Sequence, residues 1–245
     1  AHLCMFSTLK YLNSNNDQKI RDGYFQFDYK RGFIFPIKCF YGAKGNFPVG
    51  FLIWNLSKKK HLKDQTIKLD VFNAQAEKIG TKVVPSVERT AMLNKWVPRP
   101  KWDGHSVMPM FSSALNQQLE NKDQRDHIAP GFLFSVSSCG DDMQHTNYAF
   151  MLSSPYANAG AFSVTPENFE KALVLVAAKR LPISTWTNNR DAFYAPAVEL
   201  PEEFVLDCVV WVVFSGANNT VALKDVSYKS VVYQIRNNLY PFLLD

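Results

Sequence analysis

The sequence predicts a mixed α/β fold, and three observations carry this prediction. Two nearly continuous apolar runs, residues 32–40 and 47–54, flank a glycine-rich turn and predict a central hairpin whose strands are buried on both faces of a sheet. Apolar residues at helical spacing over residues 169–181 predict a helix. With 245 residues, of which 47% are apolar, the chain can bury a real core.

The elements before and after this hairpin follow from local patterns. Residues 2–12 have the spacing of a helix or a buried strand and end at a polar breaker run, and residues 20–29 predict a strand or a short helix. Within the central turn, Gly42 and Gly45 tolerate the positive φ that a tight reversal needs. Alternation over residues 66–84 predicts a second hairpin, less apolar than the first and nearer the surface.

The second half of the chain predicts further strands and helices. Pro98 and Pro100 argue against regular structure beyond Pro98, and the polar residues 116–126 suggest an exposed link between regions 1–115 and 127–245. Residues 131–136 and 148–152 predict short strands, and 221–235 a strand pair. A second helix is predicted to start at Pro201 and to turn these side chains inward: Phe204, Val205, Cys208, Val209, Val212 and Val213.

Charge and cysteine usage narrow the class of protein. A net charge of +5 is compatible with an anionic partner but does not demand one. The four cysteines are far apart and form no C-x-x-C pair, which favours a reduced, cytoplasmic protein. No run of about 18 apolar residues occurs, so no membrane span is expected. The chain begins with an apolar segment (residues 1–12) and ends with another (residues 240–245), which suggests a piece of a longer chain.

Basic residues gather in two stretches that could contact DNA. Residues 58–64 form the densest basic cluster, and residues 86–104 mix basic side chains with tryptophan, as a surface that stacks on bases would. A solvated loop and a loop packed on a core are the plainer alternatives. The candidate DNA-binding residues are Lys58, Lys59, Lys60, Lys63, Arg89, Lys95, Arg99, Lys101 and Trp102.

Catalytic signatures are missing from the sequence. The five histidines are scattered, so no metal site is predicted, and neither a P-loop nor a G-x-G-x-x-G loop is present. Ser154, Pro155 and Tyr156 suggest the base-holding loop of an amino-methyltransferase, but with one proline they are better interpreted as a turn. A thiol hydrolase using Cys39 or Cys139 with a distant histidine is a weaker alternative. No catalytic residue is assigned.

Several segments, taken together, resemble the C-terminal part of a bacterial adenine-N6 DNA methyltransferase of the restriction-modification kind. The resemblance rests on residues 6–11 (FSTLKY), 32–35 (GFIF) and 44–54 (KGNFPVGFLIW), with support from 185–191 (TWTNNRD) and 203–211 (EFVLDCVVW). In such enzymes similar segments form the last strands of the catalytic sheet, downstream of the cofactor and catalytic motifs. These signatures are structural and not catalytic, and the glycine-rich cofactor loop and Asn-Pro-Pro-aromatic motif are absent.

The resemblance implies terminal strands of a methyltransferase-like sheet followed by an accessory α/β region. The parent protein would transfer a methyl group from S-adenosylmethionine to the N6 of a flipped adenine, whereas this chain alone would bind no cofactor and be inactive. Its expected partners are double-stranded DNA and the upstream remainder of the parent chain. The alternative is a non-enzymatic interaction or scaffold module whose aromatic clusters form a protein interface.

Overall fold

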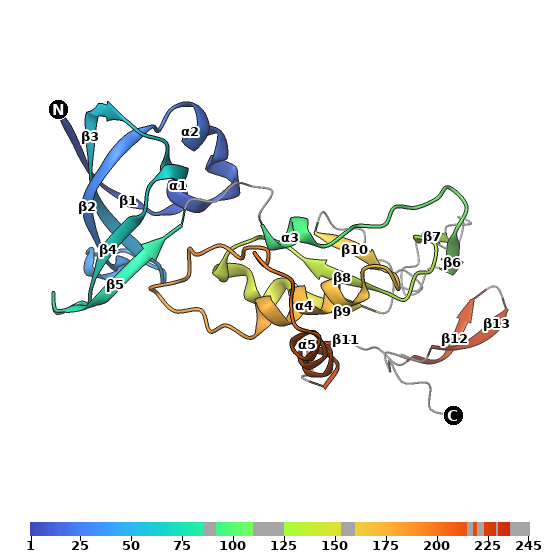
Figure 1. Cartoon of the computed structure of the whole chain (residues 1–245). Coiled ribbons are helices and arrows are strands. Elements are labelled where there is room, and N and C mark those ends of the chain that lie inside the picture. The colour runs from blue at the N-terminus through green and yellow to red at the C-terminus, as the bar shows by residue number, and fades with distance from the viewer. Residues whose placement is uncertain are drawn as a thin grey trace. The chain divides into compact units, whose positions relative to one another are not determined.

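The computed structural model describes residues 1–85, 92–109, 125–152, 160–214, 218–219, 223–228 and 230–235. They form a mixed α/β structure of two compact units, as the sequence predicted for the fold class (Figure 1). The first unit comprises residues 1–95, 141–146 and 182–195, and the second comprises residues 96–140, 147–181 and 196–245. The link expected at 116–126 lies mostly outside the described residues, so that boundary stays a prediction.

A five-stranded sheet in the order β1-β3-β2-β4-β5 dominates the first unit. Strand β3 is antiparallel to both β1 and β2, strands β2 and β4 are parallel, and β4 and β5 are antiparallel. The strands are β1 (His2–Thr8), β2 (Phe27–Pro36), β3 (Pro48–Lys59), β4 (Ile67–Phe72) and β5 (Lys78–Val84). The helices are α1 (Lys10–Asn13) and α2 (Gln18–Gly23), with short 3-10 turns at Asn15–Asp17, Ile37–Cys39 and Leu62–Asp64. Helix α3 (Leu93–Trp96) and the 3-10 turn Met143–Tyr148 begin in this unit and end in the second.

Both predicted hairpins are confirmed. Strands β2 and β3 pair around the glycine-rich turn, where Gly42 has φ +71° and Gly45 has φ +125°. These are left-handed backbone conformations that side chains with a Cβ adopt rarely, so glycine suits this reversal. Strands β4 and β5 form the second hairpin.

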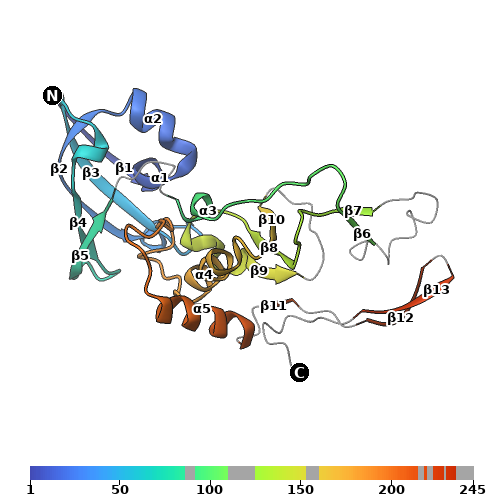
Figure 2. The ribbon, with the colours of Figure 1, turned by 45° about the vertical axis from the view of Figure 1, so that its right-hand side comes forward.

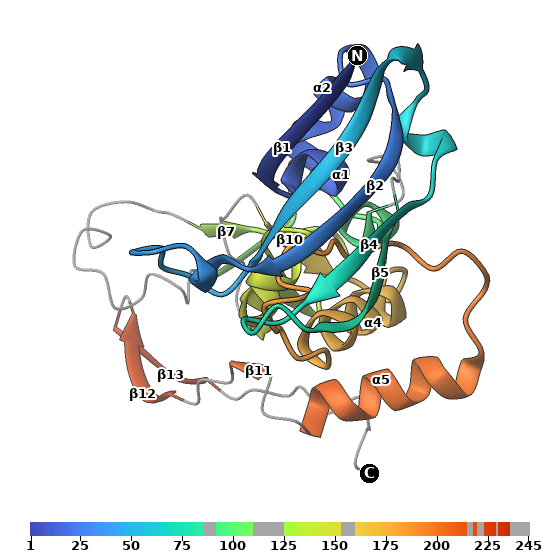
Figure 3. The same cartoon turned by 90° about the vertical axis from the view of Figure 1, so that its left-hand side faces the viewer.

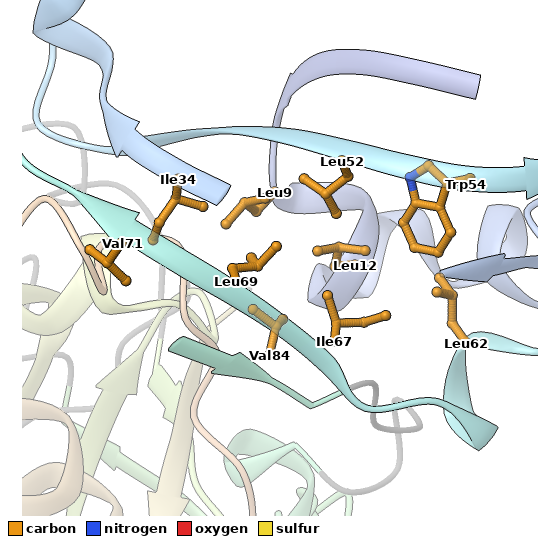
Figure 4. Close-up of a cluster of buried hydrophobic side chains, with 10 residues drawn as sticks. All are labelled: Leu9, Leu12, Ile34, Leu52, Trp54, Leu62, Ile67, Leu69, Val71 and Val84. Atoms are coloured by element: carbon orange, nitrogen blue, oxygen red, sulfur yellow. The ribbon is translucent and has the colours of Figure 1, made fainter. Parts of the chain in front are cut away.

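The inner face of the sheet carries the core of the first unit. Helices α1 and α2 cover this face, and Figure 3 shows the strands in front of the two helices. Figure 4 shows the cluster of buried side chains between them. Its members come from strands β2 to β5, from helix α1 and from the turns beside α1 and β3: Leu9, Leu12, Ile34, Leu52, Trp54, Leu62, Ile67, Leu69, Val71 and Val84.

The prediction that the central strands are buried on both faces is wrong for the structure as described. Along β2 and β3 the inward residues Ile34, Leu52 and Trp54 are fully buried. The outward residues Phe33 and Phe51 are only half-buried, because no described helix covers that side. Strand β1 likewise alternates between exposed and half-buried residues, so it is not a buried strand.

The second unit is built on a four-stranded sheet in the order β10-β8-β9-β11. Strands β8, β9 and β10 pair antiparallel, and β11 adds to β9 in parallel. Helix α4 lies against β8 and β9, and α5 lies against α4 (Figure 2). The bounds are β8 (Phe134–Ser138), β9 (Ala149–Leu152), β10 (Ala161–Val164), β11 (Asn218–Asn219), α4 (Phe169–Arg180) and α5 (Glu202–Phe214).

Both helices predicted for this half are confirmed, with one correction to their orientation. Helix α4 buries an almost continuous run from Ala172 to Ala177 because the sheet lies on one side and α5 on another. In α5, Cys208 and Val212 are buried as predicted. Phe204, predicted to face inward, is 47% exposed in the first turn of the helix, and Val205, Val209 and Val213 are half-buried.

Two strand pairs complete the described structure. Strands β6 (Val107–Pro109) and β7 (Arg125–His127) pair antiparallel. Strands β12 (Leu223–Tyr228) and β13 (Val231–Ile235) form the pair predicted over 221–235. Residues 97–106 hold neither helix nor strand, as their prolines predicted. None of the described helices combines the length and the apolar character needed to cross a bilayer.

Candidate interaction surface

A row of phenylalanine rings crosses the outer face of the five-stranded sheet. Phe6 on β1 is in register with Phe51 on β3, and Phe51 is in register with Phe33 on β2. The ring centroids of Phe6 and Phe51 are 4.7 Å apart, and those of Phe51 and Phe33 are 5.6 Å apart. Because side chains alternate across a strand, one aromatic residue on each of three neighbouring strands is enough to build this row.

Three further rings extend the row into a cluster. Phe35 follows Phe33 on the same face of β2, and their ring centroids are 6.0 Å apart. Phe40 contacts Phe6 at 6.0 Å and Phe35 at 5.5 Å, and Phe72 at the end of β4 contacts Phe33 at 5.7 Å. We call these six residues the aromatic surface: Phe6, Phe33, Phe35, Phe40, Phe51 and Phe72.

Four residues of the aromatic surface, Phe6, Phe33, Phe35 and Phe72, line an open pocket of about 480 Å³. Ligand pockets span about 300–1,000 Å³, so this one is large enough for a bulky apolar group. Phe6 stays 56% exposed at its rim, and the thiol of Cys39 is also exposed there. The pocket is lined by Phe6, Phe33, Phe35, Cys39, Phe72, Asn73, Ala74 and Ala76.

The polar side chain of the pocket already has partners. Asn73 Oδ1 accepts hydrogen bonds from the backbone N–H groups of Gln75, at 3.0 Å, and Glu77, at 2.9 Å. Its Nδ2 donates to Glu77 Oε2 at 2.7 Å. Asn73 therefore holds the β4–β5 turn, in which Ala76 takes a positive φ of 63°. With a thiol and no carboxylate or cation in its lining, this pocket fits an apolar group and does not fit S-adenosylmethionine, whose charged parts would lack partners.

Cations flank the aromatic surface. Arg31 is in register with Ile53, one pair further along the outer face than Phe33 and Phe51, and it is exposed. Lys68 is exposed two residues before Asp70, which is in register with Phe33, and Lys38 precedes Cys39. The ion pairs found among the described residues do not involve Arg31, Lys38 or Lys68, whereas Asp70 is paired with Lys78 at 2.7 Å.

The predicted basic cluster lies in the first unit, at the end of β3. Lys58, Lys59 and Lys60 are exposed, and the nearby carboxylate of Asp28 is bonded to Lys30 at 2.9 Å. That hydrogen bond is the main reason that the pKa of Asp28 lies below its usual value, and the charges of Lys58 and Lys60 lower it further. Lys63 is exposed in the 3-10 turn that follows.

The second predicted basic stretch is divided between the two units. Arg89 lies outside the described residues, and Lys95 is exposed at α3 in the first unit. In the second unit, the Arg99 guanidinium lies 4.9 Å from the ring centroid of Phe162, and Lys101 is exposed. Trp102 is 45% exposed, and its Nε1 donates to the Ser106 carbonyl at 2.9 Å. Arg99 and Trp102 thus have packing roles in their own unit.

A local turn explains the polar residues beside Trp102. The Asp103 carboxylate accepts hydrogen bonds from the backbone N–H groups of Ser106 and His105 and from the Ser106 hydroxyl. These bonds, led by the one from the Ser106 backbone, lower the pKa of Asp103 to about 2. Asp103 therefore stabilises the turn and is not a candidate acid catalyst.

The described residues offer little for catalysis. His145 Nδ1 lies 2.5 Å from Asp142 Oδ1, but the same oxygen accepts from the Gln144 backbone N–H at 3.2 Å, as at the start of a short helix. Across the described ranges, no group of three or more His, Cys, Asp or Glu side chains could hold a metal ion. Ser154, Pro155 and Tyr156 lie outside those ranges, so their interpretation as a turn stays a prediction.

Sequence reasoning did not predict the positions of Lys179, which is buried, and Lys82, which is half-buried. The Lys179 side chain is 1% exposed, and its Nζ donates to the Gly140 carbonyl. Lys82 points to the inner face of β5, and its Nζ donates to Asp191 Oδ2 at 2.6 Å and to the Thr187 carbonyl at 2.7 Å. Lys179 closes a predicted helix, where lysine is expected to be exposed, so the sequence holds no signal for its burial.

Comparisons with known proteins gave no match. No family model matches the chain, and neither a curated protein nor a solved structure was found to be similar to it.

Proposed function

We propose that the chain supplies the terminal strands of an adenine-N6 DNA methyltransferase sheet and contacts duplex DNA through Lys58, Lys59 and Lys60. The observation that carries the proposal is the order β1-β3-β2, in which β3 is antiparallel to two strands that run parallel to each other. The resemblance implies that these segments are the last strands of such a sheet, and their position as three neighbouring strands of one sheet supports the proposal. The segments that form β1, β2 and β3 are also those that carry the resemblance.

The role proposed for this chain is structural and electrostatic. The parent protein would bind S-adenosylmethionine and transfer its methyl group to a flipped adenine, using motifs that this sequence lacks. The aromatic pocket does not fit the cofactor, and we assign no step of the reaction to it. What this chain offers is the end of the sheet and a basic extension beyond it.

Three consecutive exposed lysines suit phosphate contact. Asp28, the carboxylate beside them, is already bonded to Lys30 and so leaves Lys58 and Lys60 available to an external anion. Each phosphate neutralised in duplex DNA releases counterions and steepens the dependence of the binding constant on salt by about 0.9 in a log–log plot. Binding through Lys58, Lys59 and Lys60 would therefore be strongly salt-dependent.

The experiment is fluorescence anisotropy of a labelled duplex titrated with the chain over a series of salt concentrations. Charge reversal of Lys58, Lys59 and Lys60 together to Glu is expected to weaken binding by about tenfold or more and to lower the salt slope by about 2 to 3. A control variant with Glu at Lys10, Lys19 and Lys44, all exposed in the same unit, has the same net charge. Equal affinity and slope for the two variants would contradict the assignment of the lysines.

A second candidate function is a non-enzymatic protein-interaction module, and the exposed aromatic surface favours it. Apolar association responds weakly to salt, whereas phosphate contact responds steeply. The same salt series therefore separates the two functions.

A further inference from the structure

The outer face of the five-stranded sheet has the apolar composition that is usual for a sheet face covered by another layer of protein. Six phenylalanines gather on it in mutual contact, with centroid distances of 4.7–6.0 Å. Contiguous exposed apolar patches on proteins mark interaction sites more often than isolated exposed residues do. The apolar runs of β2 and β3 are likewise typical of strands with a layer on each side.

From this surface we infer that an amphipathic helix of a partner polypeptide binds the aromatic surface, inserts an apolar side chain into the pocket and carries acidic residues along its flanks. A helix is the element that covers a sheet face, as α1 and α2 do on the inner face of this sheet. The pocket beside Phe6 and Phe72 provides a slot for one anchor residue, the usual feature of a helix-binding groove. This inference is independent of the proposed DNA contact.

Charge selects the chemistry of the helix. Arg31, Lys38 and Lys68 flank the aromatic surface without an ion pair among the described residues, and Asp70 is neutralised by Lys78. The exposed carboxylate of Glu77 lies at the β4–β5 turn, where it accepts from Asn73 Nδ2, so three cations face one carboxylate without a cationic partner. A partner with Glu or Asp beside its apolar stripe would complement these cations. A second copy of this chain is disfavoured, because a symmetric contact between two such faces would bring like charges together.

Single-stranded nucleic acid is a poorer occupant of this surface. Base stacking needs an open ring face. Here Phe6 contacts Phe35 and Phe40 edge to face, with interplanar angles of 87° and 89°, and Phe33 contacts Phe72 at 83°. These edge-to-face contacts cover part of the ring faces and leave an uneven apolar surface suited to aliphatic side chains.

The test uses a fluorescein-labelled synthetic helical peptide with leucine and phenylalanine on one face and glutamate on its flanks. The fluorescence anisotropy of the peptide is measured while it is titrated with the whole chain or with either of two variants of it. Phe6→Glu places a charge at the rim of the pocket and is expected to weaken binding by about tenfold or more. Tyr24→Glu alters an aromatic residue that is 82% exposed and lies outside the aromatic surface, and it is expected to leave the affinity unchanged.

Two matched peptides sharpen the outcome. Lysine in place of the flanking glutamates is expected to weaken binding, and a scrambled sequence of the same composition is expected not to bind. Absence of binding by the acidic peptide, equal binding of the scrambled peptide, or equal affinity of the Phe6→Glu variant with an unchanged circular dichroism spectrum would overturn the inference. Self-association of the chain that Phe6→Glu abolishes would overturn it in favour of a second copy.

Discussion

The two faces of the five-stranded sheet are built from alternate residues of the same strands. On the inner face Ile34, Leu52 and Trp54 are fully buried beneath α1 and α2, whereas on the outer face Phe6 is 56% exposed and Phe51 half-buried. Both faces are apolar, so composition alone does not separate them. The inner face stabilises the fold, and the aromatic outer face is available for contact. Substitutions on the inner face should therefore mainly lower stability, whereas substitutions on the outer face should mainly affect binding.

The largest difference is expected between Trp54 and Phe6. Trp54→Ala removes a fully buried ring and should lower the free energy of unfolding by about 3–5 kcal/mol. Phe6→Ala removes a half-exposed ring and the edge contacts of its cluster, which is expected to cost about 1 kcal/mol. Urea denaturation of both variants measures the two values. Similar losses for the two substitutions would mean that the outer face is as important to the core as the inner one.

A pair of glycines tests how tightly the inner face is packed. A Cβ at Gly50 would lie 2.6 Å from Leu9 Cδ2 and 2.7 Å from Leu52 Cδ1, so Gly50→Ala should destabilise the fold by about 1–3 kcal/mol. Gly80 on β5 has no atom within 4 Å of the same position, so Gly80→Ala is the control and should change stability by less than about 0.5 kcal/mol. If Gly50→Ala is as stable as the control in urea, the core tolerates more volume than the structure indicates.

The smallest effect on stability is expected from the carboxyl group of Asp191, at the border of the inner face. Burial raises the pKa of Asp191, and the nearby Lys82 only partly offsets this. The folded protein therefore keeps the Asp191 carboxyl protonated to a higher pH than the unfolded chain does. As the pH rises from the usual pKa of Asp through the raised one, the free energy of unfolding falls. Asp191→Asn removes this dependence, so its stability relative to the parent should rise over that window by less than about 1 kcal/mol. Thermal unfolding between pH 3 and 7 measures the trend, and parallel curves would contradict it.

Most of the strands and helices of the fold were predictable, because each has a local signal. The period of two in residues 66–84 and the spacing of apolar residues in 169–181 decide strand and helix without knowledge of their neighbours. The covering of the sheet was predicted wrongly, because the apolar runs of β2 and β3 indicate a layer on each face, whereas no described helix supplies the layer on the outer face. Phe204 was misplaced because apolar spacing within a helix does not show which of its apolar residues contact a neighbour, and in α5 only Cys208 and Val212 are buried.

The candidate site was predictable only in part. Lys58, Lys59 and Lys60 form a run in the sequence, and their exposure at the end of β3 agrees with a solvated or phosphate-binding role. The aromatic surface joins Phe6, Phe33 and Phe72 from three separated segments, so its existence depends on strand register, which one sequence does not reveal. Arg99 and Trp102 contact Phe162 and Ser106 while remaining exposed, so their role in base stacking stays a prediction.

The discontinuous make-up of the first unit has a consequence for synthesis on the ribosome. Its core and border include Trp186, which packs against the core, and Asp191, which pairs with Lys82, although five strands of this unit precede residue 85. The five strands and the buried core cluster are therefore synthesised first, whereas Trp186 and Asp191 add their contacts only after the segment that becomes α4 has emerged. A chain that stops shortly before residue 182 would keep all five strands but lack these border contacts, and Lys82 would lose the carboxylate of Asp191.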